Sequence, residues 1–219
     1  MNYLGDLSKQ DYEILKELAS NSKNILEFGI GASTQVLRNF SSGDITSVET
    51  SSFWIDITKE NLKFLDIKKD VNFLMHDEFK PNLEKYDLIF NDGIDSLRNE
   101  FGVKSWKNLK IGGIIAYHDT RRRQDIQNVI DLVNNFKDEI ESITFNKNSS
   151  NITLVKKKDK DGIIFNESID INKILSEYPY YDWNDVENKI RLKYGISINN
   201  GYPIPEYLID KNQLNIKNI

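Results

Sequence analysis

The 219-residue chain contains no cysteine, which excludes disulfide frameworks, thiolate zinc sites, iron–sulfur clusters and cysteine nucleophiles. It also lacks a long apolar run, because the longest, Ile111–Tyr117, includes two glycines. A membrane-spanning helix needs roughly 20 apolar residues. The N-terminal residues carry acids early and have no apolar stretch of the signal-peptide kind. These absences predict a soluble, cytoplasmic protein without a membrane partner.

Basic residues are too few for a typical nucleic-acid binder. The chain has 29 Lys and Arg against 34 Asp and Glu, which gives a formal net charge of −5. Proteins that bind nucleic acids through the phosphates carry a basic excess, so we expect no nucleic-acid partner. Hydrophobic residues make up 39% of the chain, which is enough for a folded core.

Short apolar runs alternate with segments of helical periodicity along most of the chain. Helices are predicted after Ser8 as N-cap and over 33–40, 51–65, 96–109 and 125–136. Strands are predicted at 24–28, 45–48, 71–75, 86–90, 111–117, 140–145 and 151–155. The last two are too close for a helical crossover and should form an antiparallel hairpin. The alternation predicts a doubly wound, Rossmann-like α/β fold with a mostly parallel seven-stranded sheet.

A charged stretch at 156–162 is the best candidate for a domain boundary. Residues 1–158 are predicted to form the Rossmann-like domain, with an N-terminal helix within 1–22. Residues 159–219 are predicted to form a helical or irregular appendage that packs on this domain. An aromatic cluster at 178–183 suits such docking.

The segment EFGIGAST, residues 27–34, follows a predicted strand and opens a predicted helix. Glycines at 29 and 31 let the backbone approach a ligand, and the helix N-terminus offers free N–H groups. Glu49 ends the next strand, where a carboxylate can accept hydrogen bonds from a ribose diol. This arrangement predicts a nucleotide-type cofactor.

The same segment discriminates between cofactors. A GxxxxGK[ST] phosphate loop is absent, and Thr34 stands near the place of the third glycine of a dinucleotide fingerprint. Glu27 would repel a pyrophosphate and suits a ligand with a ribose and a sulfonium, which is S-adenosylmethionine (SAM). An NAD(P)-dependent oxidoreductase is the alternative enzyme. A cofactor-binding subunit without catalysis is the alternative non-enzyme.

Four stretches of sequence, ILEFGIGASTQVL, ITSVETSSFW, YDLIFNDGIDS and GGIIAYHDTRR, resemble those of class I SAM-dependent methyltransferases in the same order. They are most similar to the small O-methyltransferases with an ExGxGxST loop, a DG after strand four and an HD after strand five. The resemblance covers residues 24–155. It implies an O-methyltransferase for a small hydroxylated acceptor, with a sugar or glycan as the narrower expectation.

The resemblance also implies which residues meet the cofactor. The glycine loop would border the methionine part, the acid after strand two the ribose, and the acid after strand three the adenine amine. The acid after strand four would lie beside the transferred methyl. The implied cofactor-binding residues are Glu27, Gly29, Gly31, Ser33, Thr34, Glu49, Asp77 and Asp92.

A hydroxyl acceptor must lose its proton during methyl transfer, so a base or a metal ion is expected. His118, one of two histidines, is the candidate base. Alternatively, Asp92 and Asp119 on neighbouring strand ends hold Mg²⁺, as in the catechol-type O-methyltransferases that they resemble. Thr120 stands where those enzymes have an amide. The predicted catalytic residues are His118, Asp92 and Asp119.

Three arginines at 121–123 follow the His118–Asp119 pair at the start of a predicted helix. Cations are disfavoured at a helix N-terminus, so two interpretations stay open. The run is a solvated charge cluster, or Arg121 and Arg122 bind an anionic or polar acceptor such as a sugar nucleotide. A homodimer also stays open.

Overall fold

The structure is a computed structural model, and it describes residues 7–67, 69–145 and 150–159. The predicted appendage, 159–219, lies outside the described residues apart from its first residue, and so does the aromatic cluster at 178–183. The predicted domain division therefore stays a prediction.

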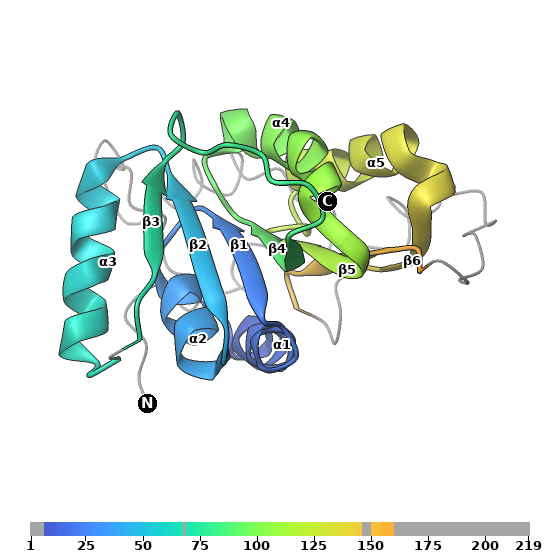
Figure 1. The fold of residues 1–219 in the computed structure, drawn as a ribbon. Coiled ribbons are helices and arrows are strands. Elements are labelled where there is room, and N and C mark those ends of the chain that lie inside the picture. Colours follow the sequence, from blue (N-terminus) through green and yellow to red (C-terminus); the bar gives the residue numbers. More distant parts are fainter. Residues whose placement is uncertain (1–6, 68, 146–149, 160–219) are drawn as a thin grey trace, which may run out of the picture.

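Seven strands form one sheet in the order β3-β2-β1-β4-β5-β7-β6 (Figure 1). Along the sheet from β3 through β2, β1 and β4 to β5, neighbouring strands are parallel. The strand β7 is antiparallel to both β5 and β6. The strands are β1 (Asn24–Phe28), β2 (Asp44–Glu49), β3 (Asn72–Met75), β4 (Tyr86–Asn91), β5 (Leu109–Tyr117), β6 (Ile140–Thr144) and β7 (Thr153–Lys157). The predicted mostly parallel sheet and its antiparallel hairpin are confirmed.

Helices cover both faces of the sheet (Figure 1). The first two pack on one face, the last two on the other, and α3 lies beside α2. Neighbouring residues of β1 show why the sheet has two cores: Ile25 packs under α1 and α2, and Leu26 packs under α4 and α5. The helices are α1 (Lys9–Ser20), α2 (Ala32–Phe40), α3 (Ser52–Phe64), α4 (Asp95–Ser105) and α5 (Arg123–Phe136).

None of these helices combines the length and the apolar character needed to cross a bilayer, a finding limited to the described residues.

The helix predicted over 96–109 is shorter than expected. It ends at Ser105, a 3₁₀ turn (Trp106–Asn108) follows, and β5 begins at Leu109. The glycine pair at 112–113 does not begin the strand, because β5 passes through it: Gly112 has φ +74° and the pairing register with β4 shifts there. A second 3₁₀ turn (Lys137–Glu139) joins α5 to β6.

Ser8 caps α1 as predicted. Its Oγ accepts a hydrogen bond from the backbone N of Asp11 at 3.1 Å and donates to Asp11 Oδ2 at 2.5 Å. We expect Ser8→Ala to lower the free energy of unfolding by about 1 kcal/mol, measured by urea denaturation, because the capped N–H loses its partner. Ser20→Ala is the control, since its exposed hydroxyl bonds only Lys16 O at the other end of the helix. Equal losses would contradict the cap's role.

Candidate functional site

The turn after β1 lies directly against the loop after β4. Gly29 has φ +81°, and a Cβ there would lie 2.2 Å from the carbonyl oxygen of Asp92. The backbone N of Asp92 donates to Phe28 O at 2.8 Å, which fixes the two loops together. At Gly31, by contrast, a Cβ would meet no atom within 4 Å. Gly29 is thus needed for packing, while the backbone at Gly31 faces open space at the start of α2.

Glu27 lies behind this turn. Its side chain is fully buried, and its two oxygens accept hydrogen bonds from Ser33 Oγ at 2.7 Å, Thr34 Oγ1 at 2.9 Å and Ser47 Oγ at 2.6 Å. Burial raises the pKa of Glu27 to about 7, and the three hydroxyls offset only part of that effect. Glu27 therefore ties β1 to β2 and to the first turn of α2.

Three of the predicted cofactor-binding residues are buried and hydrogen-bonded to one another. Glu27 and Thr34 have no exposed surface, Ser33 is 5% exposed, and both hydroxyls point at the Glu27 carboxyl. Their side chains shape the turn from behind, and the contact of all three residues with a cofactor stays a prediction. With a pKa near 7, Glu27 repels a pyrophosphate less than expected.

Glu49, at the end of β2, faces the glycine turn. Its Oε2 accepts a hydrogen bond from the backbone N of Ile30 at 3.3 Å, and its Oε1 accepts from the backbone N of Thr50 at 2.6 Å and of Ser51 at 3.1 Å. The carboxylate is partly exposed. It therefore stands beside the turn at which a cofactor is predicted, although its contact with a ribose stays a prediction.

Asp77 lies in the loop after β3. The preceding residue, His76, donates its backbone N–H to Glu49 O at 2.8 Å, so this loop runs next to the end of β2. Asp77 itself is exposed. It lies on the predicted edge of the sheet, and its contact with adenine stays a prediction.

The sequence analysis missed the residue at the centre of this edge, Arg98 of α4. Its side chain is only 6% exposed, and all three guanidinium nitrogens donate hydrogen bonds. Nε donates to Gly93 O at 2.6 Å, and the two Nη atoms donate to carboxylates. Its side-chain partners are Asp92 Oδ1 at 3.0 Å, Asp119 Oδ2 at 3.3 Å and Asp125 Oδ1 at 2.7 Å.

Burial and neighbouring charges act against each other in this cluster. Burial raises the pKa of Asp119, but the positive charges of His118, Arg122 and Arg98 outweigh burial and lower the pKa to about 2. Burial also raises the pKa of Asp125, and Arg98 offsets only part of this effect, so the pKa stands at about 6. Burial lowers the pKa of Arg98, yet the carboxylates raise it well above its ordinary value. Arg98 is therefore a permanent cation.

The backbone conformation at Asp119 helps to place its carboxylate. Asp119 has φ +58°, a left-handed conformation that is rare for residues other than glycine and is best tolerated by Asn and Asp. The chain turns sharply there, and Arg122 N donates to Asp119 O at 2.8 Å. The turn lets the Asp119 side chain face the guanidinium groups of Arg98 and Arg122.

His118 is buried between carboxylates from three elements. Its Nδ1 lies 3.1 Å from Asp92 Oδ1 and 3.5 Å from Asp119 Oδ1, and its Nε2 lies 3.4 Å from Asp11 Oδ2, which comes from α1. Burial lowers the pKa of His118, but Asp92 and Asp119 outweigh it and raise the pKa well above 6.5. An imidazolium has no lone pair for a proton, so this geometry does not favour His118 as the base. Its predicted catalytic role stays a prediction.

The predicted Mg²⁺ ligands do lie together. Ligand atoms of Asp92, His118 and Asp119 all lie within 4.8 Å of one another. However, Arg98 already bridges the two aspartates, and both ring nitrogens of His118 face carboxylates. Thr120, in the place of an amide ligand, shares hydrogen bonds with Asn151 O and Thr153 Oγ1. These side chains as arranged do not fit Mg²⁺.

The two arginines predicted to bind an acceptor have partners within the protein. Arg122 Nη2 lies 2.7 Å from Asp119 Oδ2, and Arg121 Nε donates to Ser150 O at 3.2 Å. Arg122 thus extends the charge cluster, and contact of either residue with an acceptor stays a prediction.

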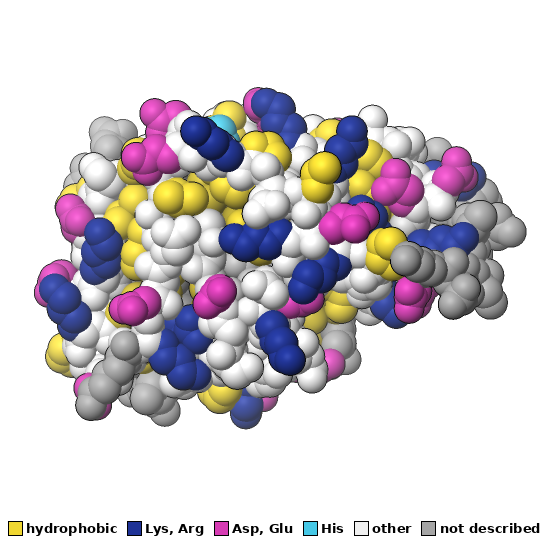
Figure 2. Space-filling view, viewed as in Figure 1, with side chains coloured by type: hydrophobic (Ala, Val, Ile, Leu, Met, Phe, Trp, Pro, Cys, Tyr) yellow, Lys and Arg dark blue, Asp and Glu magenta, His cyan; other side chains and the backbone are white. Residues whose placement is uncertain are grey.

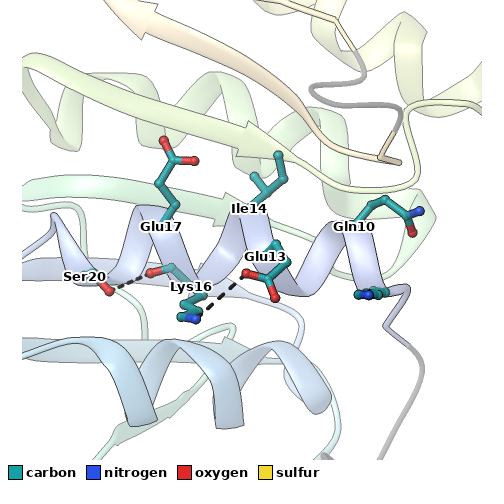
Figure 3. Close-up of a pocket in the computed structure, with 7 residues that line it drawn as sticks. Gln10, Glu13, Ile14, Lys16, Glu17 and Ser20 are labelled. Atoms are coloured by element: carbon teal, nitrogen blue, oxygen red, sulfur yellow. Dashed lines mark hydrogen bonds and ion pairs between the residues drawn. The ribbon is translucent and has the colours of Figure 1, made fainter.

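Among the described residues, no second cluster of three or more potential metal-ligating side chains lies outside this edge. Figure 2 shows Lys and Arg interspersed with Asp and Glu on the face drawn, without a broad patch of one sign. One groove runs along the exposed side of α1, where Glu13 and Lys16 pair at 3.9 Å (Figure 3). Another lies between α3 and β3 and includes Lys59 and Lys63. Neither groove includes a residue of the strand-end cluster.

Comparisons with solved structures define the fold. An O-methyltransferase from Bacillus cereus in complex with SAH (S-adenosylhomocysteine) is 19% identical, with a TM-score of 0.56, over 69% of this chain and 83% of that chain. The O-methyltransferase TomG from Streptomyces achromogenes, in complex with SAM, is 14% identical, with a TM-score of 0.56, over 70% and 81%. The chain has the class I methyltransferase fold.

A third solved structure agrees. The SAH-bound methyltransferase PaMTH1 from Podospora anserina is 17% identical, with a TM-score of 0.55, over 69% of this chain and 80% of that chain. No protein-family model matches the chain, and no curated protein matches its sequence. The methyltransferase fold predicted from the sequence is thus confirmed by three-dimensional similarity. The identities of the cofactor and of the acceptor must be argued from the residues of the site.

Proposed function

We propose that the protein binds SAM and transfers its methyl group to a hydroxyl of a small acceptor. The observation that carries the proposal is the placement of Glu49 at the end of β2, 3.3 Å from the glycine turn, in a fold whose solved examples include SAM and SAH complexes. The turn opens to solvent at Gly31, where the first N–H groups of α2 are near. A ribose diol and a methionine carboxylate suit these two groups.

The sheet topology supports SAM over NAD(P). The dinucleotide-binding fold has six parallel strands in the order 3-2-1-4-5-6. Here the antiparallel strand β7 lies between β5 and β6. Together with Thr34 near the place of a third glycine, this departure disfavours the oxidoreductase alternative.

Asp92 is the proposed partner of the acceptor hydroxyl. Arg98 and His118 hold its Oδ1 at 3.0 and 3.1 Å, and no described residue hydrogen-bonds its Oδ2. Its side chain is 23% exposed, against 13% for Asp119. In the transfer, the acceptor oxygen bonds to the methyl carbon as the sulfur–methyl bond breaks, and the hydroxyl proton passes to Asp92. A sugar or glycan is the narrower expectation for the acceptor.

The cofactor proposal is tested by Glu49→Ala. We expect this change to weaken SAM binding by about 1.5–3 kcal/mol, because the hydrogen bonds from ribose hydroxyls to a charged group are lost. Isothermal titration calorimetry measures the affinity. The control is Glu60→Ala, an exposed acid on α3 paired with Lys63, which should leave the affinity unchanged.

Two outcomes would contradict the proposal. Unchanged SAM affinity in Glu49→Ala would remove Glu49 from the ribose site, and tight binding of NAD(P) with none of SAM would favour the oxidoreductase. The non-catalytic alternative instead predicts that Asp92, His118 and Asp119 are replaceable by alanine without loss of function.

A further inference from the structure

We propose that Arg98 takes the place of a divalent cation between Asp92 and Asp119, so that the site carries its own fixed positive charge. The geometry is the first argument. A single nitrogen, Arg98 Nη2, lies 3.0 Å from Asp92 Oδ1 and 3.3 Å from Asp119 Oδ2. A Mg²⁺ ion bridging these oxygens would need about 2.0–2.1 Å to each, and the guanidinium already fills the space between them.

The position of Arg98 in its helix is the second argument. Arg98 lies in the first turn of α4, which begins at Asp95, and the helix dipole disfavours a cation there. Its burial adds a desolvation penalty. The charges of the surrounding carboxylates offset these two effects. A cation placed where neither the helix nor the core favours it is explained by its partners.

The loop after β4 gives the third argument. Arg98 Nε donates to Gly93 O at 2.6 Å, next to the residue whose carbonyl packs on Gly29. The same side chain therefore fixes the Asp92 carboxylate and the backbone beside the glycine turn. Arg98 acts as a positioning residue, because it holds Asp92 in place and does not itself face the acceptor.

The occupation of the site by Arg98 follows from geometry alone. The consequence that methyl transfer needs no added metal rests on the proposed function. The guanidinium, with five N–H donors, supplies two things that a metal ion would supply here. It neutralises the charge of the two carboxylates, and it holds them in a fixed relative orientation.

The test is Mn²⁺ binding followed by electron paramagnetic resonance, with Mn²⁺ as the probe for a hard divalent cation. We expect no stoichiometric Mn²⁺ binding by the wild-type chain. Arg98→Met removes one positive charge from beside the carboxylates, so Mn²⁺ affinity should rise on the order of a hundredfold. Arg98→Lys keeps the charge and is the matched control, which should still exclude Mn²⁺. Adding Asp119→Asn to Arg98→Met should abolish the gained binding.

Stoichiometric Mn²⁺ binding by the wild type that is lost in Asp92→Asn would overturn the proposal, and this comparison decides it even if Arg98→Met does not fold. A folded Arg98→Met chain without any gain in Mn²⁺ affinity would overturn it too. Calorimetry with SAM on the same samples separates the two proposals. Absence of SAM binding would end the proposed function and leave the Mn²⁺ result standing.

Discussion

Replacing Arg98 by Met is expected to lower the free energy of unfolding by about 3–5 kcal/mol, the usual effect of removing one partner from a buried ion pair. Met keeps the unbranched stem of the side chain but lacks the guanidinium and donates no hydrogen bond, so Asp92, Asp119 and Asp125 lose a shared partner. Asp125 has a side chain that is only 1% exposed, which makes it the most costly to leave unpaired. Urea denaturation followed by circular dichroism measures the change.

Two further variants locate this effect. Arg122→Met removes a neighbouring cation whose closest contact is one carboxylate, Asp119 at 2.7 Å, and we expect a smaller loss. Adding Asp125→Asn to Arg98→Met should restore part of the stability, because the unpaired buried charge is gone. An Arg98→Met chain as stable as the wild type would contradict the central place of Arg98 in the cluster.

The periodic parts of the chain were predictable from local patterns. Buried strands such as Asn24–Phe28 are apolar runs bounded by turn residues, and Ser8 carries a recognisable capping pattern. The order of the strands in the sheet was harder to predict from the sequence. The hairpin of 140–145 and 151–155 was predicted, but only tertiary packing places β7 between β5 and β6.

The acids at the strand ends of the site were predicted from the sequence, whereas the arginine at its centre was not. Acids at strand ends are visible in a sequence because strands and turns are, and Glu49, Asp92 and Asp119 lie on the expected edge. Arg98 was not recognised because one arginine in a helix usually points to solvent. The available signal was its place in the first turn of the helix after Asp92, three residues beyond Asp95. The arginine run at 121–123 attracted the interpretation instead.

Glu27 shows that a residue type can be read correctly and its environment missed. From sequence it was an acid at a strand end, implied by the resemblance to border the methionine part of the cofactor. Its three hydroxyl partners come from β2 and from the first turn of α2, and this convergence is a property of the fold. Burial then sets its pKa at about 7, and that value makes its role measurable.

Replacing Glu27 by Gln is expected to change how stability depends on pH by about 3 kcal/mol. The pKa of Glu27 rises from 4.5 to about 7 on folding, so the folded state holds the proton more tightly. Its contribution to stability is complete below pH 4.5 and is lost as the pH rises through about 7. A shift of this size corresponds to about 3 kcal/mol at 1.36 kcal/mol per pKa unit. Gln is neutral throughout and shows no such loss.

Urea denaturation of both proteins from pH 5 to pH 9 measures the difference, in which the titrations of all other groups cancel to first order. We expect the Gln variant to gain stability relative to the wild type as the pH rises from 5 to about 7, because Gln does not ionise, and we expect the difference to stay constant above that pH. Glu60→Gln on the surface of α3 provides the reference for an exposed carboxyl. Parallel pH curves for wild type and Glu27→Gln would show that Glu27 ionises near its ordinary pKa. Its full negative charge would then lie behind the glycine turn at neutral pH and would again disfavour a pyrophosphate there.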